Sequence, residues 1–250
     1  MIDFANIFNI FLIFCRVGSM FMVLPGIGEL YVNARTRLIF SLSLSLLFST
    51  IIDNLPTLPD RVDHLFFLLT MEVMIGVFIG TIVRFLVSTL HIVGIIVGMQ
   101  SGLGSAMLFD PNQGAQGSVI GSFIGMLAIA LLFASDLHHL LFKGLIDSYQ
   151  LFVPGKAMIL GDVIDSLARL ASDGFNVAIK IAAPQIAIGL LLLLGSGVLA
   201  RLTPSLQIFF LITPVQLLVS FFILMVTLSA SMAWYLDYVS DSLKYILYIE

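Results

Sequence analysis

Charged residues are scarce in this sequence. Only 10% of the 250 residues are Asp, Glu, Lys or Arg, whereas a soluble domain has roughly 25%. Apolar residues make up 60% of the chain, and a soluble core of this length could not bury so much apolar surface. The composition therefore predicts an integral membrane protein. The net charge of -4 also argues against nucleic acid as a partner.

Cysteine is almost absent, and so are the features of a signal peptide. Cys15 is the single cysteine, which excludes an intrachain disulfide framework. Asp3 stands where a signal peptide has a basic region, and residues 20–24 lack a small-x-small cleavage site. We therefore expect the first apolar segment to remain in the mature protein. Since no long linker divides the chain, we predict one membrane domain over residues 1–250.

The signatures of catalytic and cofactor sites are also missing. The sequence contains no legible Ser-His-Asp or Cys-His constellation and no phosphate-binding glycine motif. Asp136, His138 and His139 come nearest to a metal site. Adjacent histidines are expected to point to different sides of a helix, however, and no further ligand lies nearby in sequence. The sequence thus predicts a protein that is not an enzyme and holds no metal or cofactor.

Long apolar stretches dominate what is present. They cover residues 4–24, 38–52, 65–90, 92–107, 118–135, 165–200 and 202–236. Prolines at 184, 204 and 214 are expected to interrupt the last two. Several segments are short for a hydrocarbon core of about 30 Å or carry an ion, such as Arg16 in the first. We predict an all-α membrane protein of proline-broken helices that bury against partner subunits, with a last segment long enough for a spanning helix plus a bent extension or for a helical hairpin.

Glycines recur at every fourth position on both sides of a polar loop. Gly94, Gly98 and Gly102 precede it, and Gly117, Gly121 and Gly125 follow it. This spacing places small residues on one helix face, which lets helix backbones approach closely in apolar surroundings. Between the two glycine series, residues 109–112 read Phe-Asp-Pro-Asn and cannot continue a helix. The pattern predicts two closely packing helices around a flexible insert, which is typical of a gate.

Glu72 lies within an apolar segment, on one stripe with Gly76, Gly80 and Arg84. An ion deep in an apolar helix is costly and often functional. The alternative is that Glu72 pairs with a polar or basic group of a neighbouring helix and fixes its packing. The glycines mark this face as a helix contact and favour the second interpretation.

Methionine and other large apolar residues surround the entry of the loop. Met107, Leu108 and Phe109 lie there, after Met99. Methionine adapts to irregular surfaces and could seal a pore without a rigid fit. Ordinary core packing is the alternative, because the chain has 11 methionines scattered along its length.

Several short motifs, in their order along nearly the whole chain, resemble the FliR family of flagellar export-gate proteins. The motifs are Arg16-Val17 followed by Pro25, Arg35-x-Arg37, Glu72-x-x-x-Gly76-x-x-x-Gly80, Gly98-Met-Gln-Ser-Gly102 with Asp110-Pro111, Asp147-Ser148-Tyr149 with Pro154-Gly155, Ala183-Pro184, and the run from Ala200 to Phe209. Each motif is weak alone. One departure is the sequence at 205–208, where the family often has a Gln and an Asn beside the proline.

The resemblance implies a subunit of the type III protein export gate, in the bacterial inner membrane at the flagellar basal body. It implies assembly with small hydrophobic FliP-like and FliQ-like subunits into a helical pore. A FlhB-like switch protein and a FlhA-like export protein would be further partners. Unfolded flagellar proteins would pass through the pore, driven by the proton motive force.

The resemblance also maps a plug of the closed pore onto about residues 104–118. The expected plug residues are Gly104, Ser105, Ala106, Met107, Leu108, Phe109, Asp110, Pro111, Asn112, Gln113 and Gly114. A virulence injectisome export gate and a small-molecule transporter are the alternative functions. A transporter would be expected to have inverted repeats, and no convincing internal repeat is found.

Overall fold

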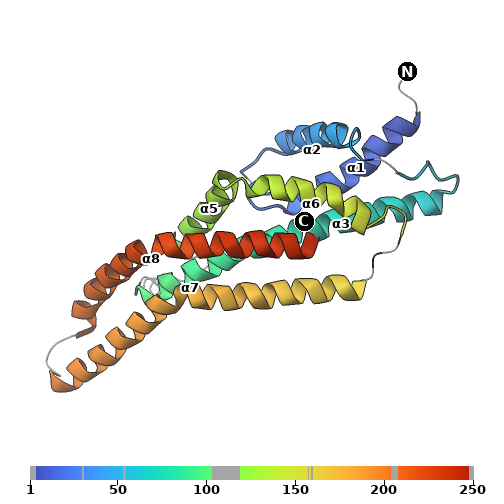
Figure 1. Cartoon of the computed structure of the whole chain (residues 1–250). Coiled ribbons are helices and arrows are strands. Elements are labelled where there is room, and N and C mark those ends of the chain that lie inside the picture. The colour runs from blue at the N-terminus through green and yellow to red at the C-terminus, as the bar shows by residue number, and fades with distance from the viewer. Residues whose placement is uncertain are drawn as a thin grey trace. The chain divides into compact units, whose positions relative to one another are not determined.

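A computed structural model describes residues 4–29, 31–52, 55–102, 119–156, 158, 160–203 and 208–247. All regular structure in these residues is helical (Figure 1), which confirms the predicted all-α class. The helices are α1 (Phe4–Val23), α2 (Ala34–Phe48), α3 (Val62–Gln100), α5 (Val119–Ala134), α6 (Leu137–Leu151), α7 (Leu160–Leu202) and α8 (Ile208–Leu247).

One helix, α3, replaces two segments that the sequence was expected to form separately. It runs without a break over 39 residues, through the position of His91 at which the predicted segments 65–90 and 92–107 were divided. Histidine is only a moderately poor helix former, and α3 contains no proline. The predicted division was wrong because a single polar residue does not end a helix.

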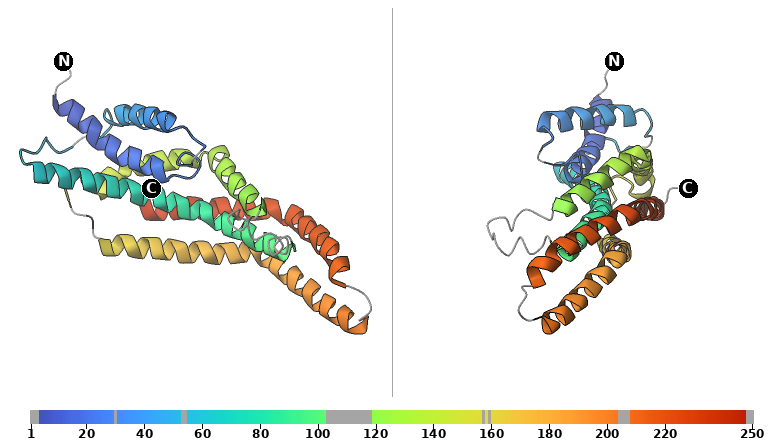
Figure 2. Two further views of the ribbon diagram at one scale, coloured as in Figure 1. Left: turned by 180° about the vertical axis from the view of Figure 1, so that it is seen from behind. Right: turned by 90° about the vertical axis from the view of Figure 1, so that its left-hand side faces the viewer.

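Two prolines lie inside helices rather than at their ends. Pro184 is within α7 and Pro214 is within α8, so the interruptions predicted at these residues were wrong. Proline removes one backbone hydrogen bond and bends a helix, and neighbouring helices can meet the freed backbone groups in apolar surroundings. The ribbons of α7 and α8 each change direction along their length (Figure 2). Pro204 lies outside the described residues.

The chain divides into two compact units. The first unit comprises Met1–Leu86, Leu132–Ala171 and Val239–Glu250, and the second comprises Val87–Leu131 and Ser172–Tyr238. In the first unit, α1 buries an apolar face that includes Leu12, Val17 and Met20. The α1 helix also packs on α2, where the ring centroids of Phe21 and Phe40 lie 5.3 Å apart.

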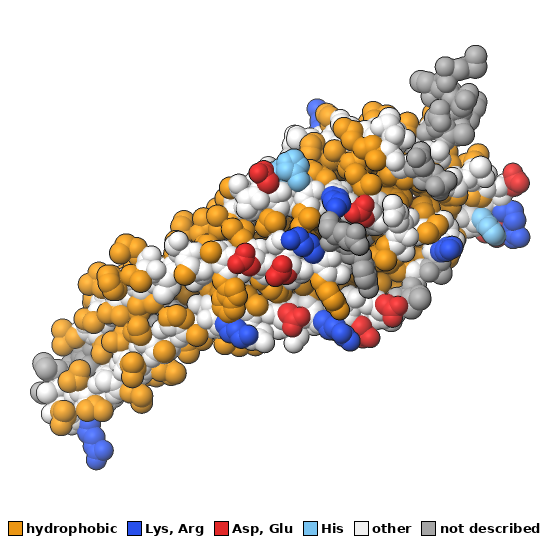
Figure 3. All heavy atoms as spheres, viewed as in Figure 1, with side chains coloured by type: hydrophobic (Ala, Val, Ile, Leu, Met, Phe, Trp, Pro, Cys, Tyr) orange, Lys and Arg blue, Asp and Glu red, His pale blue; other side chains and the backbone are white. Residues whose placement is uncertain are grey.

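Among the described helices, three are long and apolar enough to cross a membrane. They are Val62–Gln100, Leu160–Leu202 and Leu211–Ile246, and the α5–α6 pair, bent by 74°, could provide a fourth crossing. In the span of α8, only 11% of the most apolar stretch is buried within the chain. Hydrophobic side chains cover most of the surface formed by the second half of α7 and the first half of α8 (Figure 3). This surface requires lipid or another apolar partner to cover it.

Candidate functional site

A buried ion pair joins α1 to α3 in the first unit. The Nε atom of Arg16 donates to Oε2 of Glu72 at 2.6 Å, and Nη2 donates to Oε1 at 2.9 Å. Both side chains are 0% exposed. Two parallel N–H···O bonds are the strongest arrangement open to these groups and fix the relative orientation of the side chains.

Helix α6 completes the surroundings of the Arg16 guanidinium. Its Nη1 atom donates to Oγ of Ser148 at 3.0 Å, and Nη2 donates to the backbone carbonyl of Phe152 at 3.0 Å. The Tyr149 ring covers the guanidinium, with 3.7 Å from its centroid to Cζ. A buried charge needs a paired ion and further hydrogen bonds to offset its lost hydration. Arg16 has both, and it therefore connects three helices.

Glycines let the backbones of α1 and α3 approach beside this ion pair. A Cβ atom on Gly76 would collide with Oγ of Ser19 and the carbonyl oxygen of Arg16, and one on Gly80 would lie 2.8 Å from the carbonyl oxygen of Met20. Arg84, the last residue of the predicted stripe, is exposed. Thus the stripe begins at a buried ion pair and continues along a close helix contact.

The two glycine series meet in the second unit. A Cβ atom on Gly94 of α3 would overlap the Cα atom of Gly121 of α5. The Nδ1 atom of His91 lies 3.2 Å from the Gly121 carbonyl oxygen, and a Cβ on Gly125 would lie 3.7 Å from the same nitrogen. The two helices therefore cross backbone against backbone. Gly98 is buried in the last turns of α3.

The predicted plug residues, Gly104 to Gly114, lie outside the described residues, as does Gly117. The described chain stops at Gly102 and resumes at Val119. Gly102 itself has a φ of 80°, in the left-handed region that glycine adopts readily at helix ends. The plug thus remains a prediction from the sequence.

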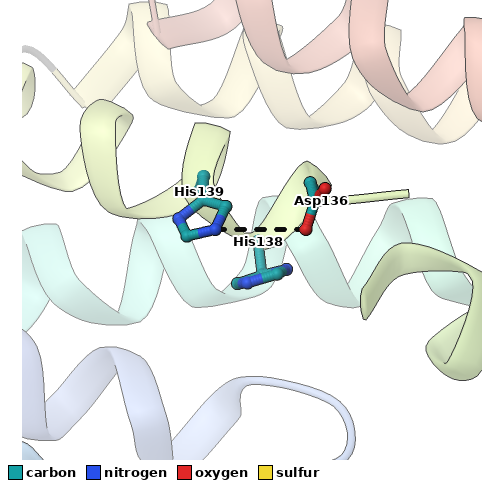
Figure 4. A group of neighbouring side chains, drawn as sticks. All are labelled: Asp136, His138 and His139. Carbon is teal, nitrogen blue, oxygen red and sulfur yellow. Dashed lines mark ion pairs between the residues drawn. The ribbon is translucent and has the colours of Figure 1, made fainter. Parts of the chain in front are cut away.

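The Asp136, His138 and His139 side chains gather at the start of α6 (Figure 4). Their ligand atoms lie within 4.8 Å of one another, and the two histidine ring centroids are 4.2 Å apart. The expectation that the adjacent histidines point to different sides was therefore wrong. The amino end of a helix disfavours a cation, and the Asp136 and His139 side chains are largely exposed to competing water. We assign this group no metal.

Arg16 and Glu72 each stand out in the sequence as an ion in an apolar segment, but no sequence pattern pairs them with each other. The feature that could have suggested their pairing is their opposite charge. Apart from their place in a motif, nothing in the sequence indicated that Ser148 and Tyr149 belong to this site, because serine and tyrosine are ordinary helix residues. Their contacts with Arg16 depend on how α6 packs.

Comparison with known proteins places this helical chain in a family. Residues 7–242 match the family described as bacterial export proteins, family 1. The chain belongs to this family. It is similar to the flagellar biosynthetic protein FliR of Caulobacter vibrioides, with 31% identity over 92% of this chain and 94% of the relative. It is also similar to the flagellar biosynthetic protein FliR of Bacillus subtilis, with 30% identity over 87% of this chain and 85% of the relative. The FliR protein of Escherichia coli is 28% identical over 82% of this chain and 78% of the relative. With three candidate spans among its described helices, this export-family member is a multi-pass membrane protein.

Proposed function

We propose that this chain is a subunit of the flagellar type III protein export gate and forms part of the pore through which unfolded flagellar proteins cross the inner membrane. The observation that carries the proposal is the likeness to proteins named FliR over nearly the full chain. A structural role also agrees with the Arg16–Glu72 pair, whose polar atoms are used in helix contacts rather than directed into a cleft.

The proposed partners are FliP-like and FliQ-like subunits, with FlhB-like and FlhA-like proteins docking nearby. The support is the uncovered apolar surface of α7 and α8, where side chains such as Leu191, Leu194 and Leu218 are 67–69% exposed. Exposed apolar area of this extent would be covered by lipid or by hydrophobic subunits. The glycine contacts at Gly76, Gly80, Gly94 and Gly121 would hold the helices of this subunit together during assembly.

Co-purification and motility test this proposal together. A tagged chain is expressed with the FliP-like and FliQ-like subunits in a bacterium that lacks its own copy of the gene. We expect a stable complex and restored swimming. A complex that restores injectisome secretion but not swimming would favour the injectisome alternative. A chain that is stable and active alone, without these subunits, would contradict the assembly.

Within this function, we propose that residues 104–118 plug the resting pore. The side chains of Met107, Leu108 and Phe109 would exclude water and ions, because an ion cannot replace its hydration shell against apolar groups. The described flanks support the proposal. On one side α3 is followed by Gly102 in the left-handed conformation, and on the other α5 contacts α3 at Gly121.

Deleting residues 106–117 is expected to make cells leak ions while the complex still assembles. The deletion removes the proposed seal but none of the described helix contacts. Membrane conductance and co-purification of the partner subunits are measured on the same cells. Gly161→Ala is the control, because a Cβ there meets nothing within 4 Å. An assembled deletion variant with unchanged conductance would exclude the plug.

A further inference from the structure

A small cavity lies within the second unit. Its volume is about 20 Å³, and the residues that line it come from α3, α5, α7 and α8. Most of the lining side chains are apolar, but three are polar: Gln185 of α7, and Thr227 and Ser231 of α8. The cavity is therefore a small space with polar residues on two of the helices around it.

Gln185 carries a polar atom that lacks a partner. The residue is only 4% exposed, and its amide Nε2 atom has no hydrogen-bond partner among the described residues. An amide N–H that is buried without an acceptor is costly, and such groups in proteins are nearly always met by protein atoms or by ordered water. Because Nε2 is a donor, the group that meets it must accept a hydrogen bond, as water does.

The hydroxyl groups of α8 complete a site for water. Oγ1 of Thr227 donates its proton to the Ile223 carbonyl oxygen at 2.9 Å, so its lone pairs remain available as acceptors. Ser231 follows four residues later on the same helix face, and its hydroxyl can donate or accept. A buried water needs about 10–15 Å³ of space and about two to four polar partners. The cavity meets both requirements.

Pro184 gives the cavity a local cause. The two α7 residues that line the cavity, Ile181 and Gln185, lie on either side of this proline in the sequence. Proline removes one backbone hydrogen bond and bends a helix, and the ribbon of α7 changes direction along its length (Figure 2). The space beside α7 therefore lies at a position where this helix departs from regular geometry.

We infer that the cavity holds one ordered water molecule, which accepts a hydrogen bond from Gln185 and donates to the hydroxyl groups of Thr227 and Ser231. The water thereby joins α7 to α8, and polar bonds between helices are among the devices that hold helices together in apolar surroundings. An organic ligand is excluded by size, because pockets for such molecules measure about 300 Å³ or more. The inference does not depend on the proposed function.

The first test is a double-mutant cycle on the full-length protein, purified with the subunits that accompany it. Gln185→Met removes the amide but keeps the length of the side chain, and Ser231→Ala removes the hydroxyl. We expect each single variant to lower the Tm by about 2–4 °C, the shift that one lost hydrogen bond produces in a chain of this size. The double variant is expected to lose clearly less than the sum, because both changes remove the same bridge.

Two controls accompany the cycle. Gln150→Met makes the same exchange at an exposed glutamine of α6 and is expected to leave the Tm unchanged. Ser196→Ala, at an exposed serine of α7, is expected to add to Gln185→Met without coupling. A Gln185→Met protein with a raised Tm would show that the amide has no partner at all. That result, or additive losses from Gln185→Met and Ser231→Ala, would overturn the inference.

A second measurement uses the unmodified protein and does not depend on how well a variant folds. X-ray pulses generate hydroxyl radicals from water, so a buried side chain beside an ordered water is oxidised, whereas one in a dry core is protected. Met232 lines the cavity, and Met20 lies in the apolar core of the first unit; they are 8% and 0% exposed. We expect oxidation of Met232 but not of Met20.

The Gln185→Leu variant shows whether that oxidation comes from the proposed water. Leucine offers the water no donor, so we expect oxidation of Met232 to fall to the level of Met20. Oxidation that persists unchanged in this variant would come from another source and would overturn the inference. Protection of Met232 in the unmodified protein would also overturn it, even if Gln185 and Ser231 prove to be coupled, because the coupling would then come from a direct bond.

Discussion

Replacing Glu72 with leucine is expected to lower the free energy of unfolding by about 3–5 kcal/mol, the usual cost of removing one partner of a buried ion pair. Arginine keeps its proton in proteins, so Arg16 would remain charged and buried. Ser148 and the Phe152 carbonyl would still accept hydrogen bonds, but neither supplies a negative charge. The amount of assembled complex and its resistance to protease in detergent measure the effect.

A double substitution distinguishes the ion pair from simple packing. Arg16→Met combined with Glu72→Leu removes both charges and leaves apolar side chains of similar size. Buried ion pairs replaced in this way often lose little stability. We therefore expect the double variant to be more stable than Glu72→Leu alone. A double variant that is less stable than either single variant would show that the charges themselves are not what couples the two positions.

An exposed pair of the same chemistry serves as the control. Arg61 and Asp63 also form two hydrogen bonds, but their side chains are 74% and 58% exposed. Surface pairs contribute about 1 kcal/mol or less because water solvates each ion well. Asp63→Leu should thus leave assembly nearly unchanged. If Asp63→Leu and Glu72→Leu prove equally harmful, burial is not the source of the effect.

Gly94→Ala is expected to lower the free energy of unfolding by about 3 kcal/mol, which is the upper end of the range for overpacking substitutions. This is the second largest effect that we expect, after that of Glu72→Leu. The added Cβ meets the backbone of Gly121 rather than the flexible end of a side chain, so α3 and α5 must move apart. Alanine is normally the better helix former by about 1 kcal/mol, so a loss here cannot come from helix propensity. Thermal denaturation of the assembled complex measures it.

The control for Gly94→Ala is Gly161→Ala, near the start of α7. No atom lies within 4 Å of a Cβ placed there, so alanine is expected to be neutral or slightly stabilising. If alanine lowers stability at Gly94 but not at Gly161, the effect comes from the crossing of α3 and α5. A Gly94→Ala complex as stable as the Gly161→Ala complex would contradict the close backbone contact.

Local patterns predicted much of the helix content, whereas long-range contacts needed the structure. The apolar segment expected at residues 118–135 forms α5 almost unchanged, since helical periodicity is read within one stretch of chain. Pro184 and Pro214 were misjudged because a local rule treats proline as a helix end, while the surroundings of a bent helix tolerate it. Arg16 and Glu72 are 56 residues apart, and nothing near either residue specifies the other.

The same separation governs how the site would be completed during synthesis. Arg16 leaves the ribosome first, its carboxylate partner follows 56 residues later, and Ser148 follows 132 residues later. A buried arginine without its counter-ion is costly. The nascent first helix therefore carries an unpaired positive charge until α3 has been made, and we expect Arg16 to become buried only after Glu72 has arrived.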